Sequence, residues 1–401
     1  MKYLLKWMLV LSLGPLLAIE AIAATQSPST VSIYIYKKLN QAQQKMDAGV
    51  PEEALLILDN IIRQQRSSAY EKALAQQASG LAYYQQKKIP QAIRQFNVAI
   101  NSNALPLPTA QKIRYNLAQL LLSEQRYDES IKTINHWLAL ADKPSAEIYL
   151  LLASVHSHAQ QYPAAIKPAE LAINLLNRPT ESHYRFLLGL YFETENHFPA
   201  TSLLEQLTLK FPEKKEYWLQ LASLYSQANR DQDSLAVTEM AHQKGLLKNN
   251  DEIVRLTQLL LHLQYPHKAA RILQKELASG TVKNSRQNQE LLATAWFNAR
   301  EYKKALIPLQ LAAEKSGDGE LYFRLAQAQF EIGLHEEVIR NIEAAQSKGS
   351  LKKPGAAYLL EGIAHHQLEH VPAANQAFET AATYEATQDQ ARRWINFLQQ
   401  Q

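Results

Sequence analysis

The sequence contains no cysteine among its 401 residues. This absence excludes disulfide bonds, cysteine nucleophiles and thiolate metal sites, and it also excludes a lipid-modified N-terminal cysteine. Glycine and proline are scarce, with 12 and 16 residues, which argues against a disordered or loop-rich chain. Apolar residues make up 46% of the sequence, so the chain can form a large core.

Charge is balanced and never concentrated. Lys and Arg number 42, Asp and Glu number 38, and no long basic run occurs. Because sequence-independent nucleic-acid binding needs a clustered basic face, we expect none. A Gly-rich phosphate loop, a G-x-S-x-G elbow and an H-E-x-x-H motif are all missing. The sequence therefore predicts a protein that is not an enzyme and needs no cofactor.

The histidines offer one candidate metal pair. His366 and His370 are four residues apart, which is the helical spacing of two ligands. Val371-Pro372 would begin the next helix, however, so His370 is expected in a turn, and no carboxylate-rich cluster accompanies the pair. We therefore expect polar surface here and no metal.

The N-terminus has the features of an export signal. A positively charged start precedes a mostly apolar stretch from Trp7 to Ile19, and Ala21 and Ala23 fit the small-x-small cleavage pattern. The stretch is shorter than the roughly 20 apolar residues that cross a bilayer. Residues 1–23 are therefore predicted to be a cleaved signal peptide, with an uncleaved membrane anchor as the alternative.

Export without lipidation predicts a soluble protein of the periplasm, if the source is a Gram-negative bacterium. No later segment is apolar enough to span a bilayer, so no stable membrane insertion is expected after cleavage. Residues 24–31 are predicted to form a polar linker.

A faint pattern returns about every 35 residues through the rest of the chain. Ten mostly small residues mark it, at gaps of 33 to 38 residues: Ala54, Ala92, Ser130, Ala165, Thr201, Ser234, Ala269, Ala305, Val338 and Ala374. Periods of this length are typical of solenoids, in which supersecondary units stack in series and share a continuous core.

A second column precedes the first by 12 residues, and nine of its ten members are Gly or Ala. We call it the small column: Ala42, Gly80, Ala118, Ala153, Gly189, Ala222, Thr257, Ala293, Ala326 and Gly362. A Trp column lies four residues before it, with Trp218 as its type. An aromatic column lies three residues after it, with Tyr83, Phe192, Tyr225 and Trp296. The pattern resembles the tetratricopeptide repeat, Trp-x2-Leu-Gly-x2-Tyr and then Ala-x3-Phe.

The resemblance implies an all-α, right-handed α-solenoid of about ten helix pairs over residues 32–388. Residues 389–401 would form a C-terminal capping helix, because a solenoid end must cover its exposed apolar surface. Ala391, Trp394, Ile395 and Leu398 are expected to face the last repeat.

The resemblance also implies a binding groove, because in this fold the first helices of successive pairs line a concave face. The residues that follow the Trp and aromatic columns should point into it. Apolar members of these positions are the predicted partner-binding residues: Tyr84, Tyr115, Leu150, Phe186, Leu219, Phe297, Phe323 and Phe330. Such a surface suits a segment of a partner protein. The alternative is that these side chains only pack between neighbouring helices.

The export signal and two terminal segments suggest a narrower group. "YKKLNQAQQKMDAGVPEEALLILDNI" and "ARRWINFL" resemble the periplasmic tetratricopeptide proteins that accompany TonB–ExbB–ExbD systems. This resemblance implies an accessory role in energised uptake of iron complexes, by contact with components of the TonB system. Two alternatives stay open: a scaffold for outer-membrane secretion, pilus or polysaccharide-export machinery, and a periplasmic enzyme or solute-binding protein.

Overall fold

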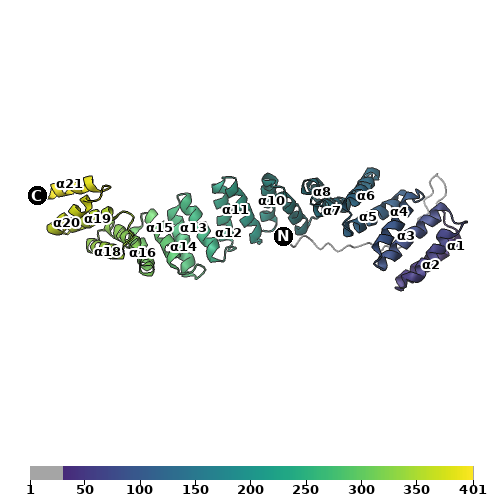
Figure 1. Ribbon diagram of the computed structural model, residues 1–401, viewed down its shortest axis with the longest axis horizontal. Coiled ribbons are helices and arrows are strands. Elements are labelled where there is room, and N and C mark those ends of the chain that lie inside the picture. Colours follow the sequence, from purple (N-terminus) through teal and green to yellow (C-terminus); the bar gives the residue numbers. More distant parts are fainter. Residues whose placement is uncertain (1–29, 401) are drawn as a thin grey trace. The chain divides into compact units, whose positions relative to one another are not determined.

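The computed structural model describes residues 30–400, and every regular element in this range is an α-helix (Figure 1). The predicted signal peptide and its cleavage residues Ala21 and Ala23 lie outside the described residues. The first ten helices are α1 Ile33–Asp47, α2 Pro51–Arg63, α3 Ala69–Gln85, α4 Ile89–Asn101, α5 Leu107–Ser123, α6 Tyr127–Leu140, α7 Ala146–His158, α8 Tyr162–Leu175, α9 Glu181–Glu193 and α10 His197–Lys210. The others are α11 Lys215–Gln227, α12 Asp231–Gln243, α13 Asn250–His262, α14 Pro266–Ala278, α15 Arg286–Asn298, α16 Tyr302–Ser316, α17 Gly319–Phe330, α18 His335–Lys348, α19 Pro354–Gln367, α20 Val371–Ala382 and α21 Gln388–Leu398.

The helices form ten consecutive pairs followed by a single helix, α21. We call the odd-numbered member of each pair helix A and the even-numbered member helix B. The chain divides inside α10 into two units, Met1–Leu203 and Leu204–Gln401. Within each unit, helices that follow one another in the sequence pack together, as α3 does with α4 and α15 with α16. The predicted α-solenoid of ten helix pairs with a capping helix is therefore confirmed.

The turn between helix A and helix B has the same backbone form in every pair. One residue adopts a left-handed φ between 54° and 77°, and in nine of the ten pairs it lies seven positions after the predicted small-column residue. The ten residues are Gly49, Lys87, Gln125, Gln160, Glu195, Asn229, Gln264, Arg300, Gly333 and Glu369. In the third pair, Gln125 N–H donates to the carbonyl of Leu122 and Arg126 N–H to that of Leu121. This is the Schellman pattern, which satisfies the last carbonyls of helix A.

This recurring turn corrects the predicted register of the fifth pair by one residue. Counting back seven residues from Glu195 gives Leu188, not Gly189. Leu188 is buried, whereas Gly189 is half-exposed and would meet nothing within 4 Å if it carried a Cβ. Likewise Ala200 is fully buried and takes the place predicted for Thr201.

The aromatic column shifts with the register. Tyr191 is 6% exposed and its hydroxyl donates to Glu170, just as Tyr225 donates to Glu205 in the next pair. Burial, with the neighbouring carboxylate, raises the pKa of Tyr225 to about 12 and raises that of Tyr191 further. Phe192, predicted for this column, is instead 37% exposed.

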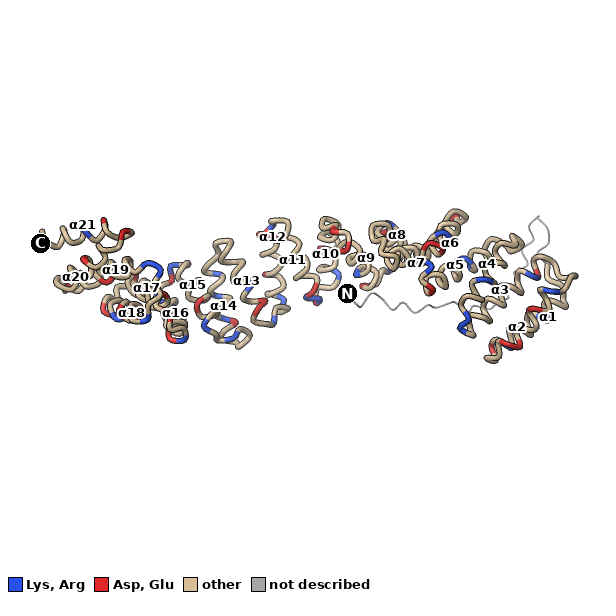
Figure 2. The backbone as a smooth tube through the Cα atoms, viewed as in Figure 1, with Lys and Arg blue, Asp and Glu red and all other residues tan. Residues whose placement is uncertain are grey.

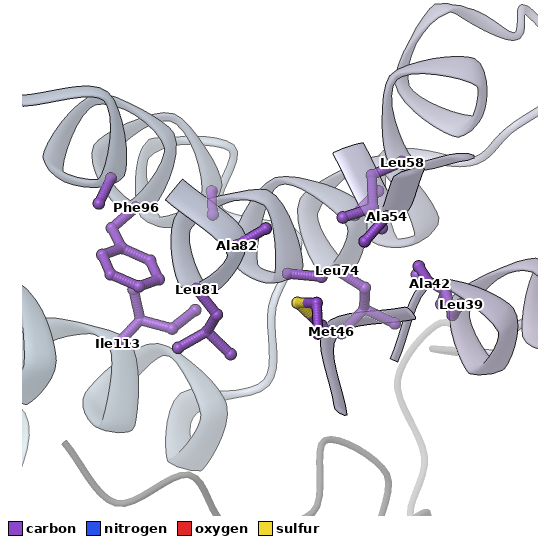
Figure 3. Packing of buried hydrophobic residues seen from close by; sticks show 14 of the residues in the cluster. Leu39, Ala42, Met46, Ala54, Leu58, Leu74, Leu81, Ala82, Phe96 and Ile113 are labelled. Carbon is purple, nitrogen blue, oxygen red and sulfur yellow. The ribbon is translucent and has the colours of Figure 1, made fainter. Parts of the chain in front are cut away.

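The core of each pair forms where the small column meets helix B. Phe96 of α4 is buried against Gly80 of α3, and a Cβ on Gly80 would lie about 2.5 Å from the ring. Gly362 and Phe378 repeat this arrangement in the tenth pair. Figure 3 shows Phe96 among the buried side chains that α1 to α5 contribute, with Leu81 and Ile113 nearby. Glycine in the small column thus makes room for a phenylalanine 16 residues later.

The capping helix α21 packs as the sequence predicted. Ala391 and Leu398 are buried, and Ile395 packs against the cluster that contains Phe378. The ring of Trp394 stacks on that of Phe378, with centroids 5.3 Å apart and planes 9° apart. These contacts cover the apolar end of the last pair, which a solenoid requires.

At the other end, a buried carboxylate fastens the first helix to the second pair. Glu71 is 4% exposed and accepts hydrogen bonds from the backbone N–H groups of Ser32 and Ser68 and from the Ser32 hydroxyl. Burial alone would raise the pKa of Glu71, but these donors outweigh it and hold the pKa below the ordinary 4.5.

We therefore predict that Glu71→Gln lowers the free energy of unfolding at neutral pH by about 1–3 kcal/mol. Because the folded pKa lies below 4.5, the stabilisation is complete above that pH and disappears as pH falls through the folded pKa. Urea denaturation at pH 7 and pH 3 should show a smaller acid loss in the variant than in the unmodified chain. Equal losses of stability between pH 7 and pH 3 in the two proteins would show that Glu71 does not cause the acid destabilisation.

Candidate functional site

The A helices of neighbouring pairs lie side by side and form one face within each unit. α1 contacts α3 and α5 contacts α7 in the first unit, and α17 contacts α19 in the second. A hydrogen bond joins two of them directly: Arg324 Nη2 of α17 donates to Thr294 Oγ1 of α15 over 2.9 Å. We call this surface the A-helix face. It carries the residues that the sequence predicted for partner binding, except for Phe323, which is buried.

In the first unit, Tyr84, Tyr115 and Leu150 are half-buried on α3, α5 and α7. Tyr84 packs partly against the first core cluster, and Tyr115 against the cluster around Ile148. Burial raises the pKa of the Tyr115 hydroxyl, and the nearby Glu147 carboxylate adds to this effect. These side chains therefore serve packing and also leave apolar surface open on the A-helix face.

The fifth pair presents different residues from those predicted. With the corrected register, Arg185 follows the Trp column, and Phe186 lies one residue beyond it. Arg185 is exposed and Phe186 half-buried. Phe192 moves to the position equivalent to Tyr84, where its 37% exposure suits the A-helix face.

In the second unit, Leu219, Phe297 and Phe330 are half-buried on α11, α15 and α17. The Phe297 ring meets that of Tyr302 edge-on at 5.2 Å, and the Phe330 ring meets His335 at 5.6 Å. Phe323 differs from the others because it is only 5% exposed and lies in the core with Ala326. Its side chain belongs to the interior and not to the open surface.

A groove of about 440 Å³ opens between α19 and α21 at the end of the A-helix face. Its lining residues are Leu359, Ile363, Gln390, Arg393, Trp394 and Phe397. Phe397 is 44% exposed, and the His366 ring lies 5.7 Å from it, edge-on. Arginine, tryptophan and phenylalanine are the residue types enriched at the centres of protein interfaces.

The sequence did not predict this groove. Trp394 was expected only to cover the last repeat, and Phe397 and Arg393 received no role. The exposure of Arg393 and Phe397 in the groove follows from the position of α21. This helix is an A helix with no helix B after it, so one of its sides is left uncovered. The available signal was the run "ARRWINFL", in which apolar residues exceed the number that one buried face requires.

The histidine pair shows no metal geometry. His370 is the residue before α20, in the predicted turn, and its ring packs against that of His365 at 5.8 Å. Across residues 30–400, no group of three or more His, Asp and Glu side chains is placed to hold a metal ion.

Comparison with known families supports the repeat assignment. Residues 78–142 and 115–177 match the family model described as Tetratricopeptide repeat. The two matches together cover residues 78–177, about a quarter of the chain, and correspond to helices α3 to α8. This segment consists of tetratricopeptide repeats, and helix pairs with the same turn continue on both sides of it.

Three solved structures that resemble this chain are distant from it in sequence. A tetratricopeptide repeat protein from Parabacteroides merdae is 16% identical, covers 66% of this chain and 99% of its own, and has a TM-score of 0.38. YrrB, described as having an unusual peptide-binding site, is 16% identical over 48% of this chain and 97% of its own, with a TM-score of 0.39. The TPR2AB domain of yeast Sti1, in a complex with pHSP90, is 16% identical over 63% of this chain and 96% of its own, with a TM-score of 0.30.

A comparison with curated proteins found no match. None of the helices among residues 30–400 combines the length and apolar character that crossing a lipid bilayer requires.

Proposed function

We propose that this chain is a non-catalytic scaffold that binds a partner polypeptide along its A-helix face. The observation that carries the proposal is the repeated exposure of apolar side chains on A helices, which ends in the 440 Å³ groove beside Trp394. Soluble proteins usually cover large apolar patches, so a row of half-exposed aromatic residues favours a binding surface.

For location and partner we propose the periplasm and a TonB-type energised uptake system. The support is the export signal predicted for residues 1–23 and the resemblance of the two terminal segments to TonB-associated tetratricopeptide proteins. The scaffold would act as an accessory that brings components of the uptake system together.

Site-specific photocrosslinking in intact cells tests the proposal. A benzoylphenylalanine in place of Phe297 on α15 is expected to capture a partner protein. The matched control carries it in place of Ile307 on α16, which is 70% exposed but on the B-helix side. Tyr115 and Leu56 form the equivalent pair in the first unit.

Identification of TonB-system components from the Phe297 position would support the full proposal. Capture of pilus, secretion or polymer-export proteins would favour the export scaffold instead. Equal capture from Phe297 and Ile307 would contradict the A-helix face as the binding surface. A deletion strain that grows normally under iron limitation would argue against the uptake role.

A further inference from the structure

A second groove lies in the second unit on the opposite type of helix. It has a volume of about 340 Å³ and lies between the B helices α12 and α14. The lining residues that matter here are Glu239, His242 and Gln243 of α12 and Lys268, Arg271 and Lys275 of α14. No A helix contributes to it, so it is separate from the A-helix face.

Three cations follow one face of α14. Lys268, Arg271 and Lys275 are spaced three and four residues apart, which places them above one another on the helix. Like charges at this spacing destabilise a helix. Their mutual repulsion is therefore unfavourable in the free chain. A negatively charged partner would relieve this repulsion.

Nearby carboxylates neutralise only part of this positive charge. Glu239 pairs with Lys268 at 2.5 Å, Glu276 accepts from His242 at 3.1 Å, and Glu301 lies 3.8 Å from His267. Burial alone would raise the pKa of Glu276, but the His242 contact and other donors lower it. Among residues 30–400, Arg271 and Lys275 have no ion pair.

We propose that this groove binds an acidic segment of a polypeptide. Arg271 can hold a carboxylate through two parallel N–H bonds, and Lys275 can hold a second one turn further along α14. Gln243 offers an amide to the segment's backbone, and half-buried Ile272 offers a small apolar contact. Figure 2 shows that Lys and Arg and also Asp and Glu occur in the region of α12 to α16.

This mixture distinguishes a polypeptide from a polyphosphate. Glu239 lines the groove, and Glu276 and Glu301 lie against its lining residues His242 and His267. These carboxylates would repel the continuous charge of a nucleic acid or an anionic membrane. A peptide can place single carboxylates at Arg271 and Lys275 and keep neutral groups beside the glutamates. The groove therefore gives the scaffold a second, charge-selected contact that is independent of the A-helix face.

Fluorescence anisotropy with a labelled oligoglutamate peptide and the full mature chain tests the proposal. We expect binding at low salt that weakens as salt rises. Arg271→Glu combined with Lys275→Glu should weaken it by about tenfold or more, because each reversal replaces an attraction by a repulsion. Arg271→Gln with Lys275→Gln removes the charge without reversing it, and should give a smaller loss if the first variant does not fold.

The matched control is Lys348→Glu with Lys353→Glu, two exposed lysines of the same unit whose reversal changes the net charge equally. This variant should keep nearly all binding, and so should the Phe297 variant of the A-helix face. Equal losses in the groove and control variants would overturn the proposal, as would no binding at all. Tighter binding of duplex DNA or anionic vesicles, lost in the groove variant, would replace the peptide with a phosphate-bearing partner.

Discussion

Trp218→Ala is expected to lower the free energy of unfolding by about 3–5 kcal/mol. Trp218 is 4% exposed and belongs to the core cluster that also contains Leu256 and Trp296. Its indole N–H donates to the carbonyl of Pro212 over 3.1 Å. Removal of the ring leaves a cavity and an acceptor without its donor. Urea denaturation followed by far-UV circular dichroism measures the effect.

Trp218→Phe is the matched control, because it keeps an aromatic ring and removes the indole N–H. Its loss should be about 1–2 kcal/mol, the size of one hydrogen bond and a small cavity. Phe192→Ala should have a still smaller effect, since that side chain is 37% exposed. Unchanged unfolding of Trp218→Ala would show that the Trp column does not lie in the core.

Gly80→Ala should destabilise the chain by about 1–3 kcal/mol, although alanine is the better helix former by about 1 kcal/mol. The added methyl group would lie about 2.5 Å from the buried ring of Phe96. Steric overlap with a side chain that is 1% exposed outweighs the helix propensity, because the ring has no free volume to enter. Denaturation experiments on the two proteins provide the comparison.

Gly189→Ala is the control for this result. Gly189 is also helical, but its Cβ would meet no atom within 4 Å, so this substitution should stabilise by about 0.5–1 kcal/mol. A second test pairs Gly80→Ala with Phe96→Leu, which recreates the Ala42–Leu58 combination of the first pair. The double variant should be more stable than the sum of the two single effects predicts. Strict additivity would mean that Gly80 and Phe96 do not interact.

Nine of the ten predicted small-column positions agree with the turns of the structure, and the fifth does not. The sequence pattern placed Gly189 in the small column because glycine is the typical residue of that column. The structure shows that Leu188 fills it, with Ala200 opposite. A sequence pattern cannot decide between neighbouring residues when the volume of the partner helix is unknown. Only the space between the helices tells which residue is at the crossing.

The predicted binding residues fall into an exposed group and a buried one, again because the sequence does not give the space between helices. Tyr84, Tyr115, Leu219, Phe297 and Phe330 keep part of their surface on the A-helix face, while Phe323 turns into the core. Spacing along one helix gives the direction of a side chain to within about a quarter turn. It does not give the distance to the next A helix, which determines how much of the side chain is covered.

The sequence by itself determined the repeat period, the pairing of helices and the absence of cysteine chemistry, because these depend on residue type and on spacing within a single helix. The tertiary structure decided the register of the fifth pair, the burial of Phe323 and both grooves. Each of these depends on how closely two separate helices approach. That distance is set by the combined volume of side chains far apart in the sequence, as Gly80 and Phe96 illustrate.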